Sequence, residues 1–399
     1  MDAINDSAEH LELTIVEGIE KIPRAQWDAI LSPDDSPFLE WDWLAAMERS
    51  GSATRKSGWA PYHIVMRERG GARIAAACPL YLKSHSMGEF VFDHGWADAA
   101  ARAGIDYYPK LVVGVPFTPH TGRRLLTARG ADRATMTRVI AGALATLCDD
   151  NKLSSVHVNF CAADEAPALA QAGFLERWGY QYHWQNNGFK TFDDYLARLK
   201  HKRRSAVRHE RAAVAEAGIK VRVHHGDEIP DALFPVMYQV YLSTIEKLYW
   251  GRQYLTEEFF GLLRKNFKRN LSFIAAYDDA EIVAGAICLE KAGVLYGRYW
   301  GCFRDVRFLH FEVCYYAGIE YAIERGLTRF EPGAGGEYKW LRGFDPALTR
   351  SMHYVAHPGL RKAIADFLKR ERREVQGWID AGSERSQLKP PPPSDEEQQ

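Results

Sequence analysis

The chain has 399 residues, a formal net charge of −1 and 46% hydrophobic residues. Its length favours two domains, and its apolar content is sufficient for a hydrophobic core in each. A nearly neutral chain has no broad field for nucleic acid or membrane, so a site for a polyanion must be a local patch. The sequence contains no run of 18 apolar residues, and its polar, acidic N-terminus lacks the features of a secretory signal. We therefore expect a cytoplasmic protein.

Each half of the chain shows a strand meander, a long helix and a further strand. In the first half, strands are expected at 62–67, 74–82 and 155–160, and a helix at 132–149. In the second half, strands are expected at 272–277, 282–290, 295–301 and 327–331, with helices at 311–325 and 360–379.

The repeated order predicts an α+β fold with mixed sheets in two similar domains. They are expected at 11–185 and 186–381, and each should be an antiparallel meander with crossover helices. The proline-rich end, at 382–399, is expected to be a disordered tail.

A strongly basic helix, expected at 195–217, joins the two halves. Up to Arg211 it carries a single carboxylate, Glu210, among many cations. These cations are Arg198, Lys200, Lys202, Arg203, Arg204, Arg208 and Arg211. A run of like charge is usually a solvated helix face, but this concentration in a nearly neutral chain also suits a phosphate-bearing partner.

The segment from Gly333 to Phe344 is the most distinctive candidate for chemistry. Glycines open and close it, and Glu337, Lys339 and Arg342 lie between them. It follows a predicted strand, where α/β proteins tend to place ligands. A lysine and an arginine can hold a phosphate or carboxylate, or stabilise a developing oxyanion. The alternative is that Lys339 is a surface lysine.

The stretch at 296–312 precedes this segment. Strand alternation places Tyr299 and Trp300 on opposite faces. His310 is a candidate general base at neutral pH, or else a capping or core imidazole. Glu312 shares one cleft with His310 only if the helix begins at or after Phe311.

Two further features concern the first half and the cysteines. Arg123, in the loop at 116–124, and Lys110 could line a pocket, although a polar surface loop is the simpler interpretation.

The six cysteines contain no CxxC motif, and the spacing of Cys302, His310 and Cys314 matches no common zinc pattern. We therefore expect no metal site.

Several long motifs together resemble a known family. They include LxRLKxKRRxxVRxER at 196–211, RYWGC at 298–302, LHFEVCYYAGIEYAIERGL at 309–327 and FEPGAGGEYKWLRGF at 330–344. In the first half they include CPLYLKSHSMGEFVFDHGWADAA at 78–100 and YYPKLVVGVPFTPHTGRRLL at 107–126. Over about 36–371 the chain resembles the FemAB-like branch of the GNAT acyltransferase superfamily, and most closely its predicted N-acyltransferases of peptidoglycan biosynthesis or recognition.

The resemblance implies two tandem GNAT-like domains and transfer of an acyl or aminoacyl group to an amine. Relatives take the aminoacyl group from aminoacyl-tRNA and add it to the peptide of a peptidoglycan precursor. They tie a lysine shortly after the last second-domain strand to the transition state, and Lys339 is its best match here. Acyl-CoA enzymes of this superfamily carry a glycine-containing loop after the fourth strand. The corresponding residues here, 302–308, contain no glycine, which disfavours standard coenzyme A binding.

The expected function is thus acyl or aminoacyl transfer to an amine, with the peptide of a peptidoglycan precursor as one acceptor. No bound cofactor is assigned; acyl-CoA and aminoacyl-tRNA are the two candidate donors, and tRNA is a candidate partner of the basic helix. The candidate catalytic residues are Lys339, His310 and Glu312. The candidate substrate contacts are Glu337, Arg342, Tyr299, Trp300, Arg203, Arg204, Arg208, Lys110 and Arg123. Two alternatives stay open: a non-catalytic module that binds cell-wall fragments, and an acyl-CoA-dependent N-acetyltransferase of a small amine.

Overall fold

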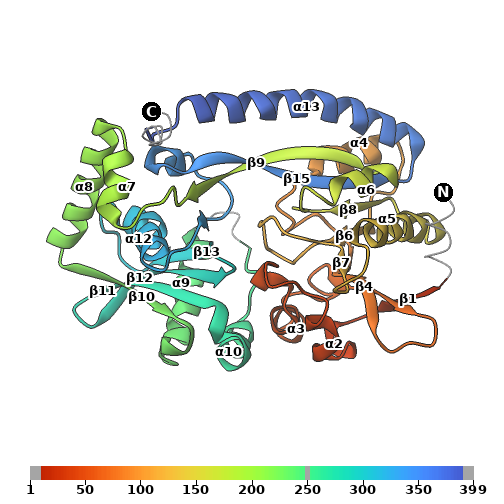
Figure 1. Ribbon diagram of the computed structural model, residues 1–399, viewed down its shortest axis with the longest axis horizontal. Helices are drawn as coiled ribbons and strands as arrows, with labels where there is room; N and C mark the ends of the chain where they lie inside the picture. Colours follow the sequence, from red (N-terminus) through yellow and green to blue (C-terminus); the bar gives the residue numbers. More distant parts are fainter. Residues whose placement is uncertain (1–9, 248–251, 390–399) are drawn as a thin grey trace, which may run out of the picture. The chain divides into compact units, whose positions relative to one another are not determined.

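The computed structural model describes residues 10–247 and 252–389, which form two compact units. The first unit contains the chain up to Gly179 together with Tyr254–Asn266 and Leu348–Gln376. The second contains Tyr180–Gln253, Phe267–Ala347 and the chain from Gly377 onwards. The units differ from the predicted domains at 11–185 and 186–381 because segments after 253 return to the first unit. Figure 1 follows the chain through both units.

The first unit contains two groups of hydrogen-bonded strands. One has the order β1-β3-β4-β7, and the other includes β8-β6-β5-β2, in which only β6 and β8 are parallel. Its strands are β1 (Leu11–Val16), β2 (Trp59–Pro61), β3 (His63–Glu68), β4 (Ile74–Cys78), β5 (Leu80–Lys83), β6 (Lys110–Val113), β7 (Leu126–Thr127) and β8 (Ser155–Val158). Its helices are α2 (Arg24–Asp28), α3 (Trp41–Arg49), α4 (His94–Arg102), α5 (Arg133–Asp150), α6 (Ala166–Gln171) and α10 (Glu257–Asn266).

The predicted strand at 74–82 is two strands, β4 and β5, in different sheets. Pro79 separates them because it has no N–H to donate to a ladder, and its carbonyl instead accepts a hydrogen bond from Gly114. The helix predicted at 132–149 is confirmed as α5, where the Asp132 side chain accepts hydrogen bonds from the first-turn N–H groups.

The second unit has one mixed sheet with the strand order β10-β11-β12-β13-β14-β9. Only β13 and β14 are parallel. The strands are β9 (Leu175–Gln185, which belongs to this unit from Tyr180 onwards), β10 (Ile219–His225), β11 (Leu271–Asp278), β12 (Glu281–Lys291), β13 (Val294–Cys302) and β14 (Arg329–Glu331). The helices are α7 (Phe192–Arg198), α8 (His201–Glu216), α9 (Leu233–Lys247), α11 (Leu309–Phe311), the π-helical turn η5 (Glu312–Tyr316), α12 (Ala317–Glu324) and the 3-10 helix η6 (Glu337–Arg342).

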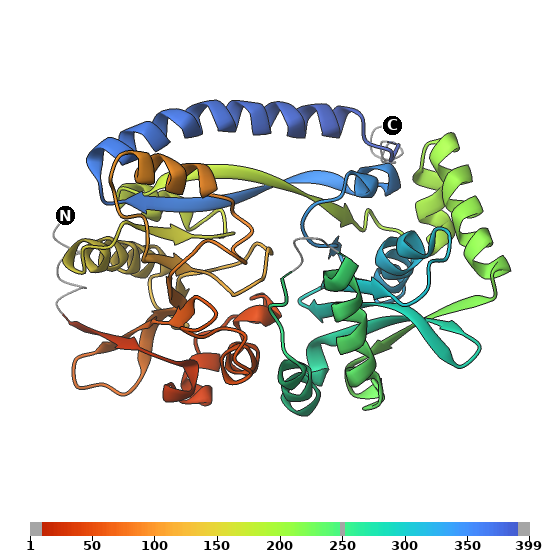
Figure 2. The ribbon, with the colours of Figure 1, turned by 180° about the vertical axis from the view of Figure 1, so that it is seen from behind.

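Helices cover both faces of this sheet. Ile274 of β11 lies in the core cluster that includes Ile319 and Ile323 of α12. The next residue back, Phe273, packs against Phe234 of α9, with ring centres 5.1 Å apart. Successive side chains of a strand point to opposite faces, so α12 and α9 lie on opposite sides, as Figures 1 and 2 show from front and back. This explains why β11 is apolar almost throughout.

The basic helix and the tail differ from expectation. The helix predicted at 195–217 is broken into α7 and α8, because Leu199 adopts an extended conformation and forms a β-bridge with Leu388. The prediction of a disordered tail from 382 is wrong for residues 382–389. The last helix, α13 (Pro358–Glu384), continues beyond Gly382, and Gln387 is buried. Residues 390–399 lie outside the described part. The strand β15 (Asp345–Val355) precedes α13.

None of the helices within the described residues is long and apolar enough to cross a membrane.

Candidate active site

The parallel strands β13 and β14 part after three residue pairs. Their pairing runs from Val294 with Arg329 to Tyr296 with Glu331, whereas β13 continues to Cys302. Gly297 is the first residue of β13 after its pairing with β14 ends. A Cβ atom on Gly297 would stand 3.1 Å from the Cα atom of Pro332. Glycine therefore permits the two backbones to approach before they separate. The carboxyl ends of parallel strands are where α/β proteins bind ligands.

Lys339 lies in the 3-10 helix η6, which follows the glycine-rich loop after β14. Its Nζ atom donates to the carbonyls of Gly333, at 2.6 Å, and Ala334, at 3.3 Å. The residue is only 4% exposed, and burial lowers the pKa of its ammonium to about 8. Gly333 and Gly336 have φ values of 91° and 87°, which allow the loop to turn its carbonyls towards the ammonium. Lys339 is therefore a buried cation and not a surface lysine.

His310 is close enough to Lys339 for its pKa to respond to the charge of that lysine. Its ring packs edge-on against Trp300, at 4.8 Å between centres, and against Tyr315, at 5.4 Å. Burial, followed by the charges of Arg342 and Lys339, lowers the pKa of His310 to about 4. The imidazole is thus neutral at pH 7.

Glu312 does not join His310. The helix begins at Leu309, before the position that would bring the two side chains together. The Glu312 carboxylate instead accepts from Nε of Arg211 at 3.2 Å to each oxygen, and burial raises the pKa of Glu312. The structure therefore places this candidate base in an ion pair with the basic helix.

Arg342 is enclosed and fully engaged. Its Nε donates to the hydroxyl of Tyr316 at 2.7 Å, one Nη donates to the carbonyl of Tyr338 and the other pairs with Glu210. Its guanidinium carbon lies 3.4 Å from the ring centre of Phe311. Arg342 thus anchors the segment that carries Lys339. The side chain of Glu337 lies outside the described part of the structure.

Tyr299 and Trp300, the two aromatic candidates of β13, point to opposite faces of the sheet, as strand alternation predicts. Trp300 contacts His310, whereas Tyr299 packs against Tyr241 of α9, with ring centres 4.9 Å apart, and accepts a hydrogen bond from Arg298. Of these two residues, Trp300 is the one that contacts His310.

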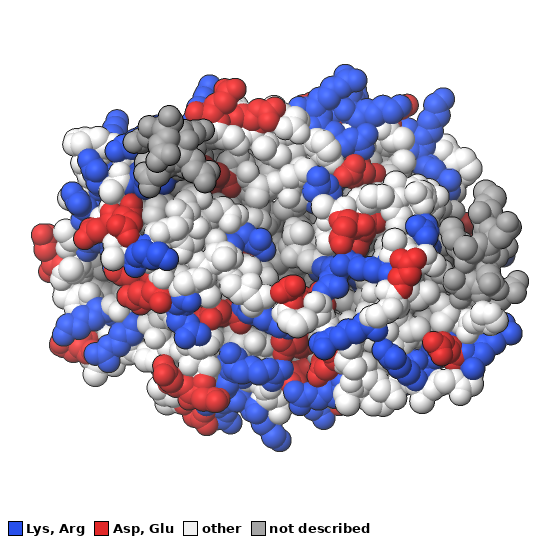
Figure 3. Space-filling model, viewed as in Figure 1, with Lys and Arg blue, Asp and Glu red and all other residues white. Residues whose placement is uncertain are grey.

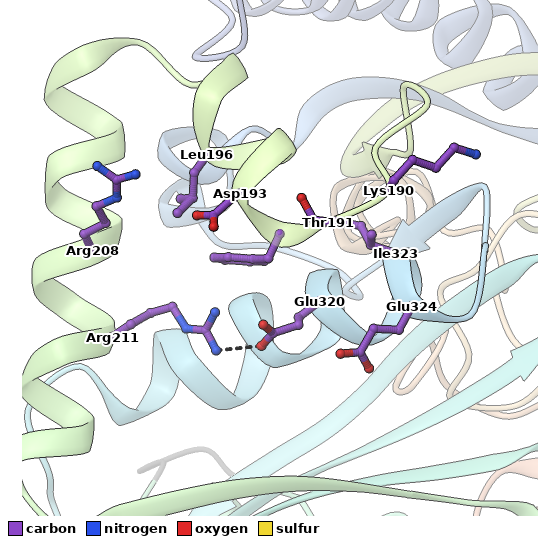
Figure 4. Close-up of a pocket in the computed structure, with 10 residues that line it drawn as sticks. Lys190, Thr191, Asp193, Leu196, Arg208, Arg211, Glu320, Ile323 and Glu324 are labelled. Carbon is purple, nitrogen blue, oxygen red and sulfur yellow. Dashed lines mark hydrogen bonds and ion pairs between the residues drawn. The ribbon is translucent and has the colours of Figure 1, made fainter.

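The arginines of α8 lie at its accessible surface. The Nε atom of Arg203 donates to Gln387 at 3.2 Å, Arg204 is partly exposed and Arg208 is exposed. Arg208 and Arg211 line a pocket of about 580 Å³ between α7, α8 and α12 (Figure 4). Basic and acidic side chains are interspersed over the face seen in Figure 3, so the basic segment is a local feature.

Lys110 and Arg123 belong to the first unit, and each is held in an ion pair. Lys110 is fully buried and pairs with Glu89, at 3.0 Å, and with Asp93. The Nε atom of Arg123 pairs with Asp35 at 2.5 Å. Because its side chain is fully buried, Lys110 does not line an accessible pocket, and its two carboxylate partners compensate the buried charge.

Sequence reasoning missed Glu210 and Tyr316. Glu210 joins Arg342 and the hydroxyl of Tyr316 in one buried contact network. Its signal was available, since it is the lone carboxylate within the basic run. The π-helical turn that positions Tyr316 has no sequence signal of comparable strength, although such turns are frequent at functional sites. Among the described residues, no group of three or more His, Cys, Asp or Glu side chains could hold a metal ion.

Comparisons with known proteins agree with this architecture. A family model described as peptidoglycan biosynthesis/recognition, FemAB-like, matches residues 18–389. A search of curated proteins finds no significant match. FemX is 13% identical, with a TM-score of 0.51 over 89% of this chain and 100% of FemX. The C-terminal domain of a provisionally named lysylphosphatidylglycerol synthetase from Agrobacterium fabrum is 10% identical, with a TM-score of 0.53 over 86% and 95% of the two chains.

A conserved protein of unknown function from Bacteroides thetaiotaomicron is 11% identical, with a TM-score of 0.51 over 86% of this chain and all of that one. At such identities the likeness shows the fold, and the predicted α+β class with two GNAT-like domains is confirmed. The family match covers nearly the whole sequence. The chain belongs to the FemAB-like family.

Proposed function

We propose that the chain is an N-acyltransferase that moves an acyl or aminoacyl group to an amine, with the peptide of a peptidoglycan precursor as acceptor. The observation that carries the proposal is the position of Lys339, a buried ammonium in η6 whose Nζ atom is held by the carbonyls of the loop that follows β14. The FemAB-like family and its fold support this reaction class.

Lys339 suits the role of oxyanion stabiliser. An ammonium has three N–H donors, and two of them are directed to the carbonyls of Gly333 and Ala334. The third is thereby fixed in direction. When the acceptor nitrogen attacks the donor carbonyl, the carbonyl electron pair moves to oxygen, and this third donor binds the resulting charge. A preorganised donor in a desolvated site is a major source of catalysis.

His310 suits the role of proton carrier. Because its imidazole is neutral at pH 7, it can accept the proton released by the attacking nitrogen. As the bond from the carbonyl carbon to the leaving group breaks, the imidazolium returns that proton to the leaving oxygen or sulfur. The products are the amide and the discharged carrier. Glu312 is paired with Arg211 and takes no part in this step.

An RNA-borne donor is favoured over acyl-CoA. The loop at 303–308 contains no glycine, and its last residue, Phe308, has a φ of 66°. Arg204 and Arg208, with Arg203 beside them, give α8 cations for the phosphates of such a donor. The chain would then act in the cytoplasm, where tRNA is charged.

The test is a transfer assay with aminoacyl-tRNA and acyl-CoA as donors and a muropeptide precursor as acceptor. Lys339→Met should lower the rate by about 100-fold without unfolding the chain. Lys268→Met is the matched control, because Lys268 also donates to a main-chain carbonyl, that of Ile229. A folded Lys339→Met variant with the wild-type rate would remove Lys339 from the mechanism.

A recognition module is the second candidate function, and one observation favours it. Neither His310, with a pKa near 4, nor the ion-paired Glu312 is an ordinary general base at pH 7. Calorimetry with muropeptides, beside the transfer assay, separates the two functions. Tight binding with no transfer from either donor would establish the module.

A further inference from the structure

The pocket beneath the basic helix has features that acyl transfer does not explain. It holds about 580 Å³, a size typical of small-ligand sites. Its walls come from the start of α7, from α8 and from α12 (Figure 4). An apolar strip of Phe192, Leu196 and Ile323 runs between charged side chains.

Four charged side chains at this pocket have no protein partner. Within residues 10–247 and 252–389, nothing pairs with the side chains of the cations Lys190 and Arg208 or of the carboxylates Asp193 and Glu324. Arg211 and Glu320, by contrast, are paired with each other at 2.6 Å. The pocket therefore offers cations that can bind an anion and carboxylates that can accept hydrogen bonds. These groups suit a ligand with an anionic group and an N–H donor.

The pocket also has a rigid flat surface. The guanidinium carbon of Arg211 lies 4.4 Å from the ring centre of Phe192, and its two carboxylate partners, Glu312 and Glu320, hold the guanidinium in place. Aromatic rings and arginine planes are the surfaces on which nucleobases stack.

The pocket adjoins the row of cations on α8, and this points to a polyanion as its ligand. Arg208 lines the pocket and Arg204 lies one turn before it on the same face of α8, while Lys200 and Lys202 at the helix start are exposed. A polyanion bound along these cations reaches the pocket at Arg208.

We propose that this pocket binds one nucleotide of a single-stranded RNA. The base lies against Phe192, its exocyclic amino group donates to Glu324, and its phosphate contacts Arg208. The inference rests on the proposed function only in expecting an RNA-borne donor.

Isothermal titration calorimetry with AMP, IMP, adenosine and inosine tests each contact. AMP carries an exocyclic amino group that can donate to Glu324, whereas IMP carries a carbonyl oxygen at that position. AMP should therefore bind about tenfold more tightly than IMP. Arg208→Ala should reduce AMP affinity to that of adenosine and leave adenosine binding unchanged. Glu324→Ala should make adenosine and inosine bind equally. Arg361→Ala, on α13, is a control that should change none of these values.

A short oligoadenylate distinguishes the sources of the nucleotide. Tighter, salt-sensitive binding of the oligomer, weakened by Arg204→Ala, identifies RNA. AMP binding with no gain for the oligomer identifies a free nucleotide and overturns the RNA assignment. Equal affinities for AMP and IMP, or no binding at millimolar AMP, overturn the pocket itself. If the protein transfers acyl groups but does not bind AMP, the pocket proposal fails and the proposed function stands. If it binds AMP but transfers no acyl group, the proposed function fails.

Discussion

The Nη2 atom of Arg342 lies 2.7 Å from the Oε2 atom of Glu210, so the segment that carries Lys339 is anchored to the basic helix. The same carboxylate oxygen accepts from the hydroxyl of Tyr316, which in turn accepts from Nε of Arg342. The three side chains form a closed set of hydrogen bonds. Because both charged partners are largely buried, the loss of one leaves the other without compensation.

Removal of Arg342 should therefore destabilise the protein strongly. We expect Arg342→Met to lower the free energy of unfolding by about 3 kcal/mol. A double-mutant cycle with Glu210→Gln should give a coupling of about 1–3 kcal/mol, measured by urea unfolding. Arg304→Met is the control: its pair with Asp278 is exposed and should contribute less than about 1 kcal/mol. Additive losses for Arg342 and Glu210 would show that the pair is not coupled.

The pH dependence of transfer should report Lys339. Burial lowers the pKa of this ammonium from 10.5 to about 8. If the charged form binds the oxyanion, activity is retained below pH 8 and falls as the proton is lost above it, by about tenfold per pH unit. Lys339→Arg should show no such fall, because a guanidinium stays charged. Rates measured from pH 6 to 10 check this; a wild-type profile flat to pH 10 contradicts the role.

Sequence patterns predicted the strand meanders and the long helices but not the environments of the charged residues. The apolar runs of β11 and β12 are long and strongly patterned, so their positions were predicted to within one residue. The break at Leu199 was missed because the bridge that stabilises it comes from Leu388, far along the chain. Burial decides whether Lys339, Lys110 and Arg342 are solvent-facing or enclosed, and this depends on contacts distant in sequence. The sequence was therefore sufficient to name candidate site residues, but not the side chains and carbonyls with which they pair in the structure.

The close approach of α9 to β13 gives a prediction on stability. A Cβ on Gly301 would lie 1.9 Å from the carbonyl oxygen of Val240, a backbone atom that cannot move without shifting α9. Gly301→Ala should therefore cost several kcal/mol of unfolding free energy, about 3 or more. Gly377→Ala is the control: it lies in α13 with no atom within 4 Å, so alanine should stabilise by about 0.5–1 kcal/mol. Thermal unfolding of both variants checks the pair, and an unchanged midpoint for Gly301→Ala would contradict the packing.

Lys110 gives the last prediction, which concerns the interior of the first unit. Burial alone would raise the pKa of Asp93, but the Lys110 ammonium, together with His157 and the hydrogen bond from Ser86, outweighs it and holds that pKa below its usual range. Lys110→Met leaves the buried carboxylates of Asp93 and Glu89 unpaired. The free energy of unfolding should fall by about 3–5 kcal/mol at pH 7.

The loss should shrink towards pH 5. Without Lys110 the folded state binds protons at the buried carboxylates more readily than the unfolded chain does, so stability rises as pH falls. Lys369→Met, which removes an exposed partner of Asp366, should change stability by less than about 1 kcal/mol at either pH. Urea unfolding at pH 5 and pH 7 measures both variants. A small, pH-independent effect of Lys110→Met would instead mean that this lysine does not compensate the two carboxylates, and the surface-pocket prediction for it would regain support.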